Sequence, residues 1–273
     1  LTATGFQINV TQSQINASGQ TYIYMAIRAP MMVEPEAATD VFKPTLGQAA
    51  SNISVGFPMD MAIIATTSGD AGHDVVTRLQ GEKTHLRTSS TAAETADNGH
   101  WNMDSMDTFY QDQMGGTKIN YFWKRAKGFF DVVAYTASSN AAHTVNHSLG
   151  VPPELLISRR RQATSNWYAG QVNNYLRLNT DGGNLGTPVF NNYTSTTYYV
   201  TAGTWSAGDE TITYLFATLA GISKVGSYTG NGSNQTIDCG FSAGARFILI
   251  KRTDDDGDWY LWDSVRGIVA ADD

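Results

Sequence analysis

The chain has 273 residues, of which 41% are hydrophobic and 16% charged, and its formal net charge is −7 at pH 7. Binding to a nucleic-acid backbone or an anionic membrane surface depends on clustered Lys and Arg, and the longest basic run here is Arg159 to Arg161, so no nucleic-acid partner is expected. Apolar runs fall well short of the ~20 residues of a membrane helix, so no membrane insertion is expected. Cys239 is the only cysteine, which excludes an intrachain disulfide.

The first 38 residues combine a strand-like stretch with a linker. Phe6, Ile8 and Val10 alternate with polar residues, a turn signal follows, and an apolar run begins at Tyr22, which together predict a β-hairpin. Prolines then recur between positions 29 and 44, where they favour an extended linker. We interpret residues 1–38 as the C-terminal remnant of a preceding module plus a linker.

One layout of apolar and aromatic runs around a short break occurs three times. It is clearest in INYFWKRAKGFFDVVAY (119–135) and ITYLFATLAGISKVGSY (212–228), and TYIYMAIRAPMMV (21–33) is a weaker copy. Aligning Tyr24, Tyr121 and Tyr214 gives offsets of 121 − 24 = 97 and 214 − 121 = 93 residues. Such a spacing is about the size of one small domain and too long for a solenoid turn.

A second set of anchors agrees with the first. A glycine corner before a strand occurs at Gly56, Gly150 and Gly240, with offsets of 150 − 56 = 94 and 240 − 150 = 90. Between these anchors, short runs rich in Tyr, Val, Ile, Thr and Phe alternate with Gly, Asn, Ser and Asp clusters, as in β-sandwiches and barrels. The sequence therefore predicts an all-β chain of tandem β-sandwich (jelly-roll or lectin-like) modules that repeat at about 95 residues.

The module boundaries follow from these anchors and lie near Gly128 and Gly221. We expect sandwich modules at 39–128 and 129–221, and the N-terminal part of a further, truncated module at 222–273. Because the chain begins with Leu1 and both ends fall within a repeat, we expect it to be a window from a longer tandem-repeat protein.

Aromatic residues are the candidate ligand-binding residues. A sugar ring stacks on an exposed aromatic face, and the candidates for such stacking are Trp167, Tyr168, Trp259, Tyr260 and Trp262. Alternation along 259–262 places two aromatic or apolar side chains on each face of one strand, so one face belongs to the core. The alternative for each of these aromatics is a place in the core or in an interface with a neighbouring module.

The acidic run at 254–258 is the candidate metal site. Asp254, Asp256 and Asp258 lie at alternate positions around a glycine turn and could offer hard oxygen ligands to Ca²⁺. The run lacks the remaining ligands of an EF-hand loop, and the alternative is a solvated β-hairpin turn. His143 and His147 are four residues apart but lie at a predicted strand end without further ligands, which does not favour zinc.

No catalytic motif is present, so we do not expect an enzyme. The sequence has no Gly-x-Ser-x-Gly elbow, no phosphate loop and no cysteine in a nucleophile motif, and no cofactor is expected. Two carboxylates are all that glycoside hydrolysis needs, so a polysaccharide depolymerase stays open as an alternative.

Three stretches carry a resemblance to a known group of proteins. HTVNHSLGVPPELLISRRR (143–161), TYLFATLAGISKVGSYTGNGSNQTIDCGF (213–241) and FILIKRTDDDGDWYLWDSVRG (247–267) resemble the tandem repeats of virion structural and tail-fibre-like proteins of marine tailed bacteriophages. The likeness is weaker over 39–127. It implies lectin-like sandwich repeats and a location on the virion surface, and it supplies no catalytic residues.

The expected function is therefore a non-enzymatic structural protein of a phage virion. Such a protein would form a fibre, spike or capsid appendage and contribute to host adsorption, with a host surface glycan as receptor. Its expected partners are other virion proteins and further copies of itself in a homo-oligomer, for which a trimer is one option. A secreted or cell-surface carbohydrate-binding adhesion protein is the alternative from another class.

Overall fold

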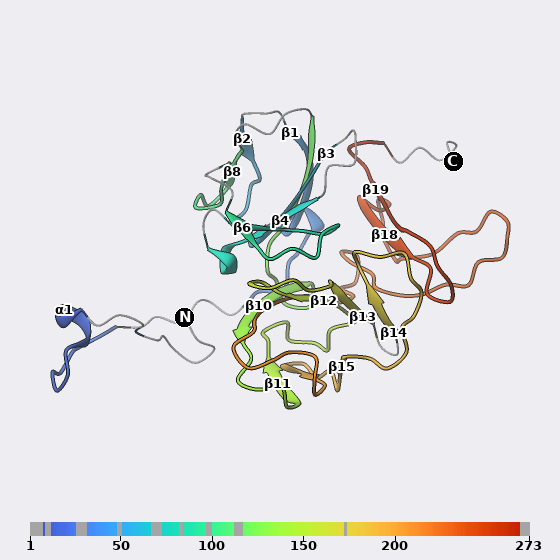
Figure 1. Cartoon of the computed structure of the whole chain (residues 1–273). Coiled ribbons are helices and arrows are strands. Elements are labelled where there is room, and N and C mark those ends of the chain that lie inside the picture. Colours follow the sequence, from blue (N-terminus) through green and yellow to red (C-terminus); the bar gives the residue numbers. More distant parts are fainter. Residues whose placement is uncertain are drawn as a thin grey trace. The chain divides into compact units, whose positions relative to one another are not determined.

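The computed structural model describes residues 8, 12–25, 32–47, 51–66, 73–81, 84–96, 100–111, 117–171 and 174–267 (Figure 1). It divides into two compact units, Leu1–Met31 and Met32–Asp273, and each is described by itself. Nearly all of the regular structure is antiparallel β-strand, which confirms the predicted all-β class.

The N-terminal unit contains one short helix, α1 (Ser13–Asn16). The Tyr22 hydroxyl donates to the Ser13 carbonyl at 2.6 Å and accepts from the Ala17 amide at 2.9 Å, which closes a loop over the helix. The described residues 12–25 hold no strand, so the hairpin expected here is wrong for this part. The predicted strand residues Phe6 and Val10 lie outside the described residues.

The first sandwich consists of two sheets. One runs in the order β1-β9-β3-β4-β5-β6 and the other in the order β2-β8-β7. Its strands are β1 (Phe42–Gly47), β2 (Ser51–Ser54), β3 (Met61–Thr66), β4 (Asp74–Thr77), β5 (Thr84–Arg87), β6 (Thr95–Ala96), β7 (Trp101–Asn102), β8 (Thr108–Gln111) and β9 (Lys118–Trp123). Two 3₁₀ turns, η1 (Ala38–Asp40) and η2 (Arg78–Gln80), accompany them.

The central strands of the larger sheet are apolar on both faces because both faces are covered. On β3, Ala62 and Ile64 face the core between the two sheets, together with Phe109 of β8 and Phe122 of β9. The alternate residue Met61 belongs to a different cluster outside the sandwich. A strand buried on both sides reads as a continuous apolar run, which explains the sequence MAIIAT.

The second sandwich again has two sheets. Their orders are β10-β17-β12-β13-β14 and β11-β16-β15. The strands are β10 (Phe130–Thr136), β11 (His143–Asn146), β12 (Leu155–Arg160), β13 (Tyr168–Gln171), β14 (Asn174–Arg177), β15 (Phe190–Asn191), β16 (Thr197–Val200) and β17 (Glu210–Phe216). Leu156, Phe190, Tyr198 and Leu215 fill the core between these sheets.

The two sandwiches have the same strand order. If β6 is left out, β1-β9-β3-β4-β5 corresponds strand by strand, in chain order, to β10-β17-β12-β13-β14, and β2-β8-β7 corresponds to β11-β16-β15. The turns that follow β9 and β17 also agree: Gly128 (φ 76°) lies in a turn closed by the bridge Ala126–Phe130, and Gly221 (φ 74°) lies in one closed by Leu219–Ser223. A positive φ favours glycine because it has no Cβ.

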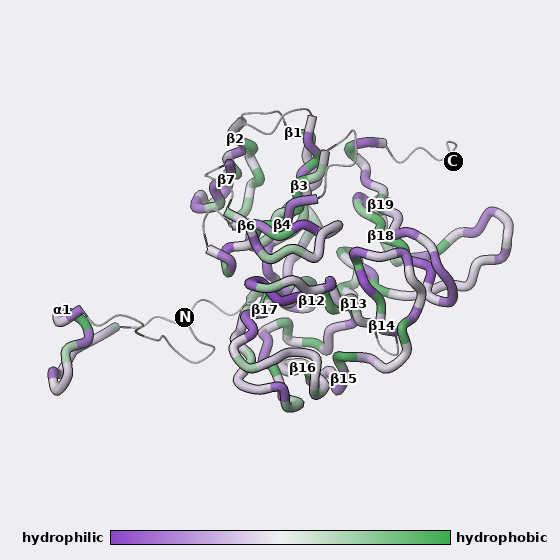
Figure 2. Tube along the Cα trace, in the orientation of Figure 1, coloured by the Kyte–Doolittle hydropathy of each residue, from purple (hydrophilic) through white to green (hydrophobic). Residues whose placement is uncertain are grey.

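A third element follows the second sandwich. β18 (Phe247–Lys251) and β19 (Trp259–Asp263) form a two-stranded sheet, here called the C-terminal hairpin. Figure 2 colours β18 as hydrophobic. The Phe247 ring lies 5.6 Å from that of Phe42 and 5.3 Å from that of Tyr121, so the hairpin packs on the outer face of the first sandwich.

One hydrophobic cluster joins all three elements. It contains Met61, Tyr121 and Trp123 from the first sandwich and Ile157 and Tyr214 from the second, and the hairpin packs against it through Phe247, Trp259, Leu261 and Val265. We call this cluster the shared core. It differs from the two cores inside the sandwiches because it lies between the larger sheets, and it positions the junctions described next.

Candidate functional site

The junction between the two sandwiches is built around Arg159 of β12. Its side chain is fully buried, and its guanidinium donates to the carbonyls of Ser90 at 2.8 Å, Thr91 at 3.0 Å and Ala92 at 2.5 Å. It also lies 4.9 Å from the ring centroid of Trp167. Burial lowers the pKa of Arg159 to about 10, so the side chain remains a cation at neutral pH.

Two further side chains extend the same junction. The Trp167 indole N–H donates to the Arg87 carbonyl at 2.7 Å, and the ring is 1% exposed. Arg161 pairs with Glu94 through two N–H···O contacts of 2.9 Å each, a bidentate geometry that adds direction as well as energy.

The junction between the second sandwich and the hairpin repeats these contacts. The Trp259 indole donates to the Arg177 carbonyl at 2.9 Å, as Trp167 does to Arg87. Lys251 Nζ donates to the Asp181 carbonyl at 2.6 Å, in the place that Arg159 takes at the first junction.

Backbone hydrogen bonds also occur at equivalent positions in the two junctions. Ser165 N–H to Thr91 O (2.9 Å) and Glu94 N–H to Arg161 O (2.7 Å) correspond to Gly257 N–H to Asp181 O (2.8 Å) and Asn184 N–H to Thr253 O (2.8 Å). For the residues that come from the later element of each junction, the two junctions differ by a constant 92 positions, for example 259 − 167 = 92 and 251 − 159 = 92. For the residues that come from the earlier element, the difference is 90 positions, as in 177 − 87 = 90 and 181 − 91 = 90. The two junctions therefore use one contact pattern.

Three of the five aromatics expected to stack on sugars are packed against other parts of the chain. Trp167 is buried in the junction, which removes it from the candidate set because a buried ring cannot reach a sugar. Trp259 is half-buried against the shared core and hydrogen-bonded to Arg177. Tyr168 is half-buried against the core of the second sandwich, with its ring 5.2 Å from that of Trp205.

Tyr260 and Trp262 are the exposed pair. They lie on the face of β19 opposite Trp259 and Leu261, as the alternation predicts, and are 54% and 38% exposed. Their rings are stacked with centroids 5.6 Å apart and planes 17° apart. Because both rings remain partly exposed, this pair leaves aromatic surface that can contact sugar rings or apolar side chains.

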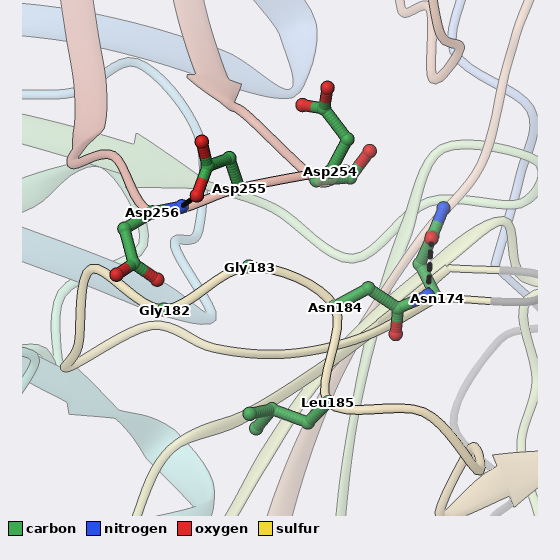
Figure 3. A pocket seen from close by; sticks show the side chains of 9 residues that line it. Asn174, Gly182, Gly183, Asn184, Leu185, Asp254, Asp255 and Asp256 are labelled. Atoms are coloured by element: carbon green, nitrogen blue, oxygen red, sulfur yellow. Dashed lines mark hydrogen bonds between the residues drawn. The ribbon is translucent and has the colours of Figure 1, made fainter.

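The acidic run lies beside a pocket at the hairpin junction. Figure 3 shows this pocket, which has a volume of about 580 Å³ and is lined by Asn174, 182–185 and 253–256. Its rim is held by hydrogen bonds, among them Asn184 Nδ2 to Asn174 Oδ1 at 3.1 Å. Polar groups line it, so it can offer hydrogen bonds to hydroxyl or amide groups.

The aspartates of this run do not form a metal centre in the described part of the chain, where no group of three or more His, Cys, Asp and Glu residues could hold a metal ion. In Figure 3 the carboxyl groups of Asp254, Asp255 and Asp256 point in different directions. Asp254 and Asp255 instead contact Arg252 at 2.8 and 3.2 Å. Asp258 is exposed. These aspartates therefore form a solvated turn, and the calcium hypothesis gains no support from their geometry.

Two buried polar residues between the hairpin and the first sandwich, Tyr121 and Asp263, were not predicted from the sequence. The Tyr121 hydroxyl donates to Asp263 at 2.9 Å, and Asp263 also accepts the Val265 and Arg266 amides at 2.9 Å each. Burial raises the pKa of Tyr121, and its hydrogen bond to Asp263 raises it further. Burial opposes ionisation of Asp263, but the hydrogen bonds from Arg266 and Tyr121 outweigh it and lower the pKa of this carboxyl. The only available signal was the polar residue that ends an apolar strand.

Within the described residues, no helix has the length and hydropathy needed to cross a membrane.

Comparisons with known proteins give one match. No curated protein and no solved structure shows significant similarity to the chain. The model of the family described as a domain of unknown function (DUF7483) matches residues 124–271, which cover the second sandwich and the C-terminal hairpin. This match spans more than half of the 273 residues (271 − 124 + 1 = 148), and the chain therefore belongs to the DUF7483 family.

Proposed function

We propose that this protein is a non-enzymatic structural component of a tailed-phage virion, in which tandem β-sandwich modules build a fibre, spike or capsid appendage. The resemblance of residues 143–161, 213–241 and 247–267 to phage virion repeats supports the location. The observation that carries the structural role is the contact pattern that occurs at both junctions, around Trp167 and again around Trp259.

A repeated junction is what a tandem array needs. Each new module would be added through the same carbonyls and the same indole donor, so length can grow without new kinds of contact. The equal strand orders of the two sandwiches support a repeating module of about 95 residues. We propose that the C-terminal hairpin belongs to a third module of this kind, and that copies of the chain associate as a homo-oligomer and with other virion proteins.

Adsorption to a host surface glycan is the second part of the proposal. Tyr260 and Trp262 provide the exposed, stacked aromatic surface that supports it. The pocket around Asn174 and Asn184 offers polar groups that suit sugar hydroxyls.

Location is tested on particles. Antibodies raised against the purified chain are applied to density-purified particles of the virus that encodes it, and labelling is viewed by electron microscopy together with mass spectrometry of the particles. We expect several copies per particle and labels on an external appendage. Recovery of the protein only from the soluble fraction of the lysate, with unlabelled particles, would contradict the proposal.

Adsorption is tested with matched variants. Binding of the chain to host cells and to their purified polysaccharide is measured for Tyr260→Ala, Trp262→Ala and the control Tyr228→Ala, whose ring is 51% exposed elsewhere. We expect the first two to bind about tenfold more weakly, since a stacked aromatic contact contributes about 0.5–1.5 kcal/mol beyond the area it buries and 1.4 kcal/mol is a factor of ten in affinity. The control should bind as the parent does. Release of oligosaccharides during the assay would instead indicate a depolymerase.

A further inference from the structure

The interior of the first sandwich contains two polar residues at places where the second sandwich has threonines. The pairing of β9 with β3, set beside that of β17 with β12, makes Lys118 equivalent to Thr211 and Asn120 equivalent to Thr213. One offset relates both positions, because 211 − 118 = 93 and 213 − 120 = 93. On β9 the two residues lie on the same face as Phe122, which belongs to the core between the sheets. Lys118 and Asn120 are 7% and 0% exposed.

The Asn120 amide lacks the hydrogen bonds that its equivalent makes. Thr213 shares a hydrogen bond of 2.7 Å with Ser158, the residue with which it pairs on β12. The residue that pairs with Asn120 on β3 is Ile64, whose side chain has no polar group. In the described part of the chain, neither side-chain amide atom of Asn120 has a hydrogen-bond partner. An unpaired buried amide costs about 1–3 kcal/mol, so its presence in this core needs a physical reason.

Lys118 places an amine in the same interior. Burial lowers the pKa of Lys118, although the carboxylate of Asp74 acts in the opposite direction. Asp74 lies on β4 and is 5% exposed. Desolvation increases the neutral fraction of an amine, and the neutral amine is the nucleophilic form.

The amine and the amide come from neighbouring positions of one strand face. Lys118 and Asn120 are two residues apart on β9, which corresponds to about 6.6 Å along a strand. Gly47 of β1 pairs with Lys118, and a Cβ on this glycine would collide with Asn120 Nδ2. The Asn120 amide therefore leans over the position beside Lys118. The flexible four-carbon stem of lysine can extend along the strand toward it.

We propose that Lys118 and Asn120 form an intramolecular isopeptide bond in the folded chain. Lys118 Nζ attacks Asn120 Cγ, a C–N bond forms, and the bond from Cγ to Nδ2 breaks. Asp74 accepts one proton of the lysine ammonium, and a second proton of the amine moves to the departing nitrogen, which leaves as ammonia and takes back the proton from Asp74. An ammonium and a carboxamide thus become a secondary amide and an ammonium ion, which balances atoms and charge.

The bond accounts for both unusual groups in this interior. It removes a buried charge and replaces an unpaired carboxamide by one secondary amide. The ring that it closes holds 118–120 of β9 extended, and β9 lies between β1 and β3 in the larger sheet. All three residues belong to inner strands of this sheet, so their burial does not depend on what precedes or follows the sequence. The proposal is also independent of a location on a virion.

Mass spectrometry of the purified full-length chain tests the bond. We expect an intact mass that is lower than that of the sequence by one ammonia molecule. Trypsin cleaves after a free lysine, so it should skip the acylated Lys118 and release residues 88–124 as one peptide, one ammonia lighter than its sequence. An unmodified mass with complete cleavage after Lys118 would overturn the proposal.

Variants identify the two partners of the bond, and circular dichroism checks that each variant folds. Lys118→Met keeps an apolar stem without the amine, and Asn120→Ala removes the carboxamide, so each should have the full mass of its sequence. Gln111→Ala is the matched control because Gln111 is a second carboxamide that is fully buried in the same interior. It should lose ammonia as the parent does. A bond that forms in Asn120→Ala but not in Gln111→Ala would overturn the choice of Asn120.

A second source of ammonia loss is separated by the same digest. Where an asparagine precedes a glycine, as at Asn98 and Asn231, the backbone amide can attack the side chain and form a succinimide. A succinimide leaves Lys118 open to trypsin and does not require its amine. Ammonia loss that persists in Lys118→Met, with cleavage after Lys118 in the parent, would therefore overturn the proposal.

The part played by Asp74 is measured as a rate. Asp74→Asn keeps the shape of the side chain but cannot accept the proton. We expect the linked form to appear at least about 100-fold more slowly after synthesis, because a positioned acid–base group contributes about 10²–10⁴-fold. Equal rates in the parent and in folded Asp74→Asn would overturn this assignment.

Discussion

The two junctions of this protein share one contact pattern but differ in burial. Between the sandwiches, Arg159 and Trp167 are 0% and 1% exposed, and Arg161 and Glu94 form a bidentate pair. At the hairpin, Lys251 and Trp259 are only half-buried. The two junctions therefore share their hydrogen-bonding pattern. They differ in how deeply the side chains are buried, and burial determines how much each side-chain contact contributes to the free energy of unfolding.

The ion pairs at the two junctions connect different parts of the chain. The carboxylate of Glu94 comes from the first sandwich and its partner Arg161 from the second, so this pair holds two elements together. Arg252 instead pairs with Asp254 and Asp255 of its own loop, where all three side chains are more than half exposed. Exposed local pairs of this kind contribute little stability.

The largest expected effect is that of removing Arg159. Arg159→Ala deletes a buried stem and removes the guanidinium donor of the Ser90 and Ala92 carbonyls, whereas the Thr91 carbonyl keeps the Ser165 amide. We expect the free energy of unfolding to fall by about 2–4 kcal/mol. Lys251→Ala, the matched change at the hairpin, should cost about 1 kcal/mol. Urea unfolding followed by circular dichroism measures both, and equal losses would show that burial does not distinguish the junctions.

A glycine at the hairpin junction gives the next effect. A Cβ at Gly183 would lie 2.9 Å from the Asp255 carbonyl oxygen, whereas one at Gly182 meets nothing closer than Thr180 Oγ1 at 3.9 Å. Gly183→Ala should therefore cost about 1–3 kcal/mol and loosen the hairpin, and Gly182→Ala should cost clearly less. Amide hydrogen exchange in β18 and β19 reports the loosening, and similar exchange in both variants would contradict it.

The paired tryptophans allow a smaller and more direct comparison. Phenylalanine keeps an aromatic ring but cannot donate to the Arg87 or Arg177 carbonyl. We expect Trp167→Phe to lower the free energy of unfolding by about 1–2 kcal/mol and Trp259→Phe by about 0.5–1.5 kcal/mol, because water replaces the lost donor more easily at the exposed junction. Urea midpoints in the reverse order would contradict this explanation.

Acid should weaken the contact between the hairpin and the first sandwich. The pKa of Asp263 is lower in the folded chain than its usual value of 3.8, so the folded state binds this proton less readily than the unfolded state. The resulting stability is present above about pH 4 and is lost as pH falls through the folded pKa. Urea unfolding between pH 7 and 3 should show a shallower acid loss for Asp263→Asn than for the parent, with Tyr121→Phe between them. Identical slopes would contradict the assignment.

Several features of the fold were predictable because they depend on neighbours in sequence. Alternating apolar residues predict strands, and the corner glycines Gly56, Gly150 and Gly240 have φ values of 88°, 81° and 71°, which few other residues adopt. The module boundary expected near Gly128 coincides with a turn in which this glycine has a φ of 76°. The two faces of β19 also followed from alternation alone.

The candidate site was predictable only in part. Trp167 and Trp262 were both predicted to stack on sugars, yet Trp167 is buried in a junction and Trp262 is exposed. The aspartates at 254–258 suggest a metal loop until their directions and the Arg252 pairs are seen. Local sequence cannot settle such cases because it does not show which surface another part of the chain will cover.

The sequence by itself determined the all-β class, the two faces of β19 and the glycine corners, since these are decided by side-chain alternation and local backbone conformation. The tertiary structure decided which aromatic rings became junction anchors. The partners in those anchors are far apart along the chain: Trp167 and Arg87 are 80 residues apart, and Trp259 and Arg177 are 82. Burial and hydrogen bonding at these positions exist only once separate sheets pack on the shared core.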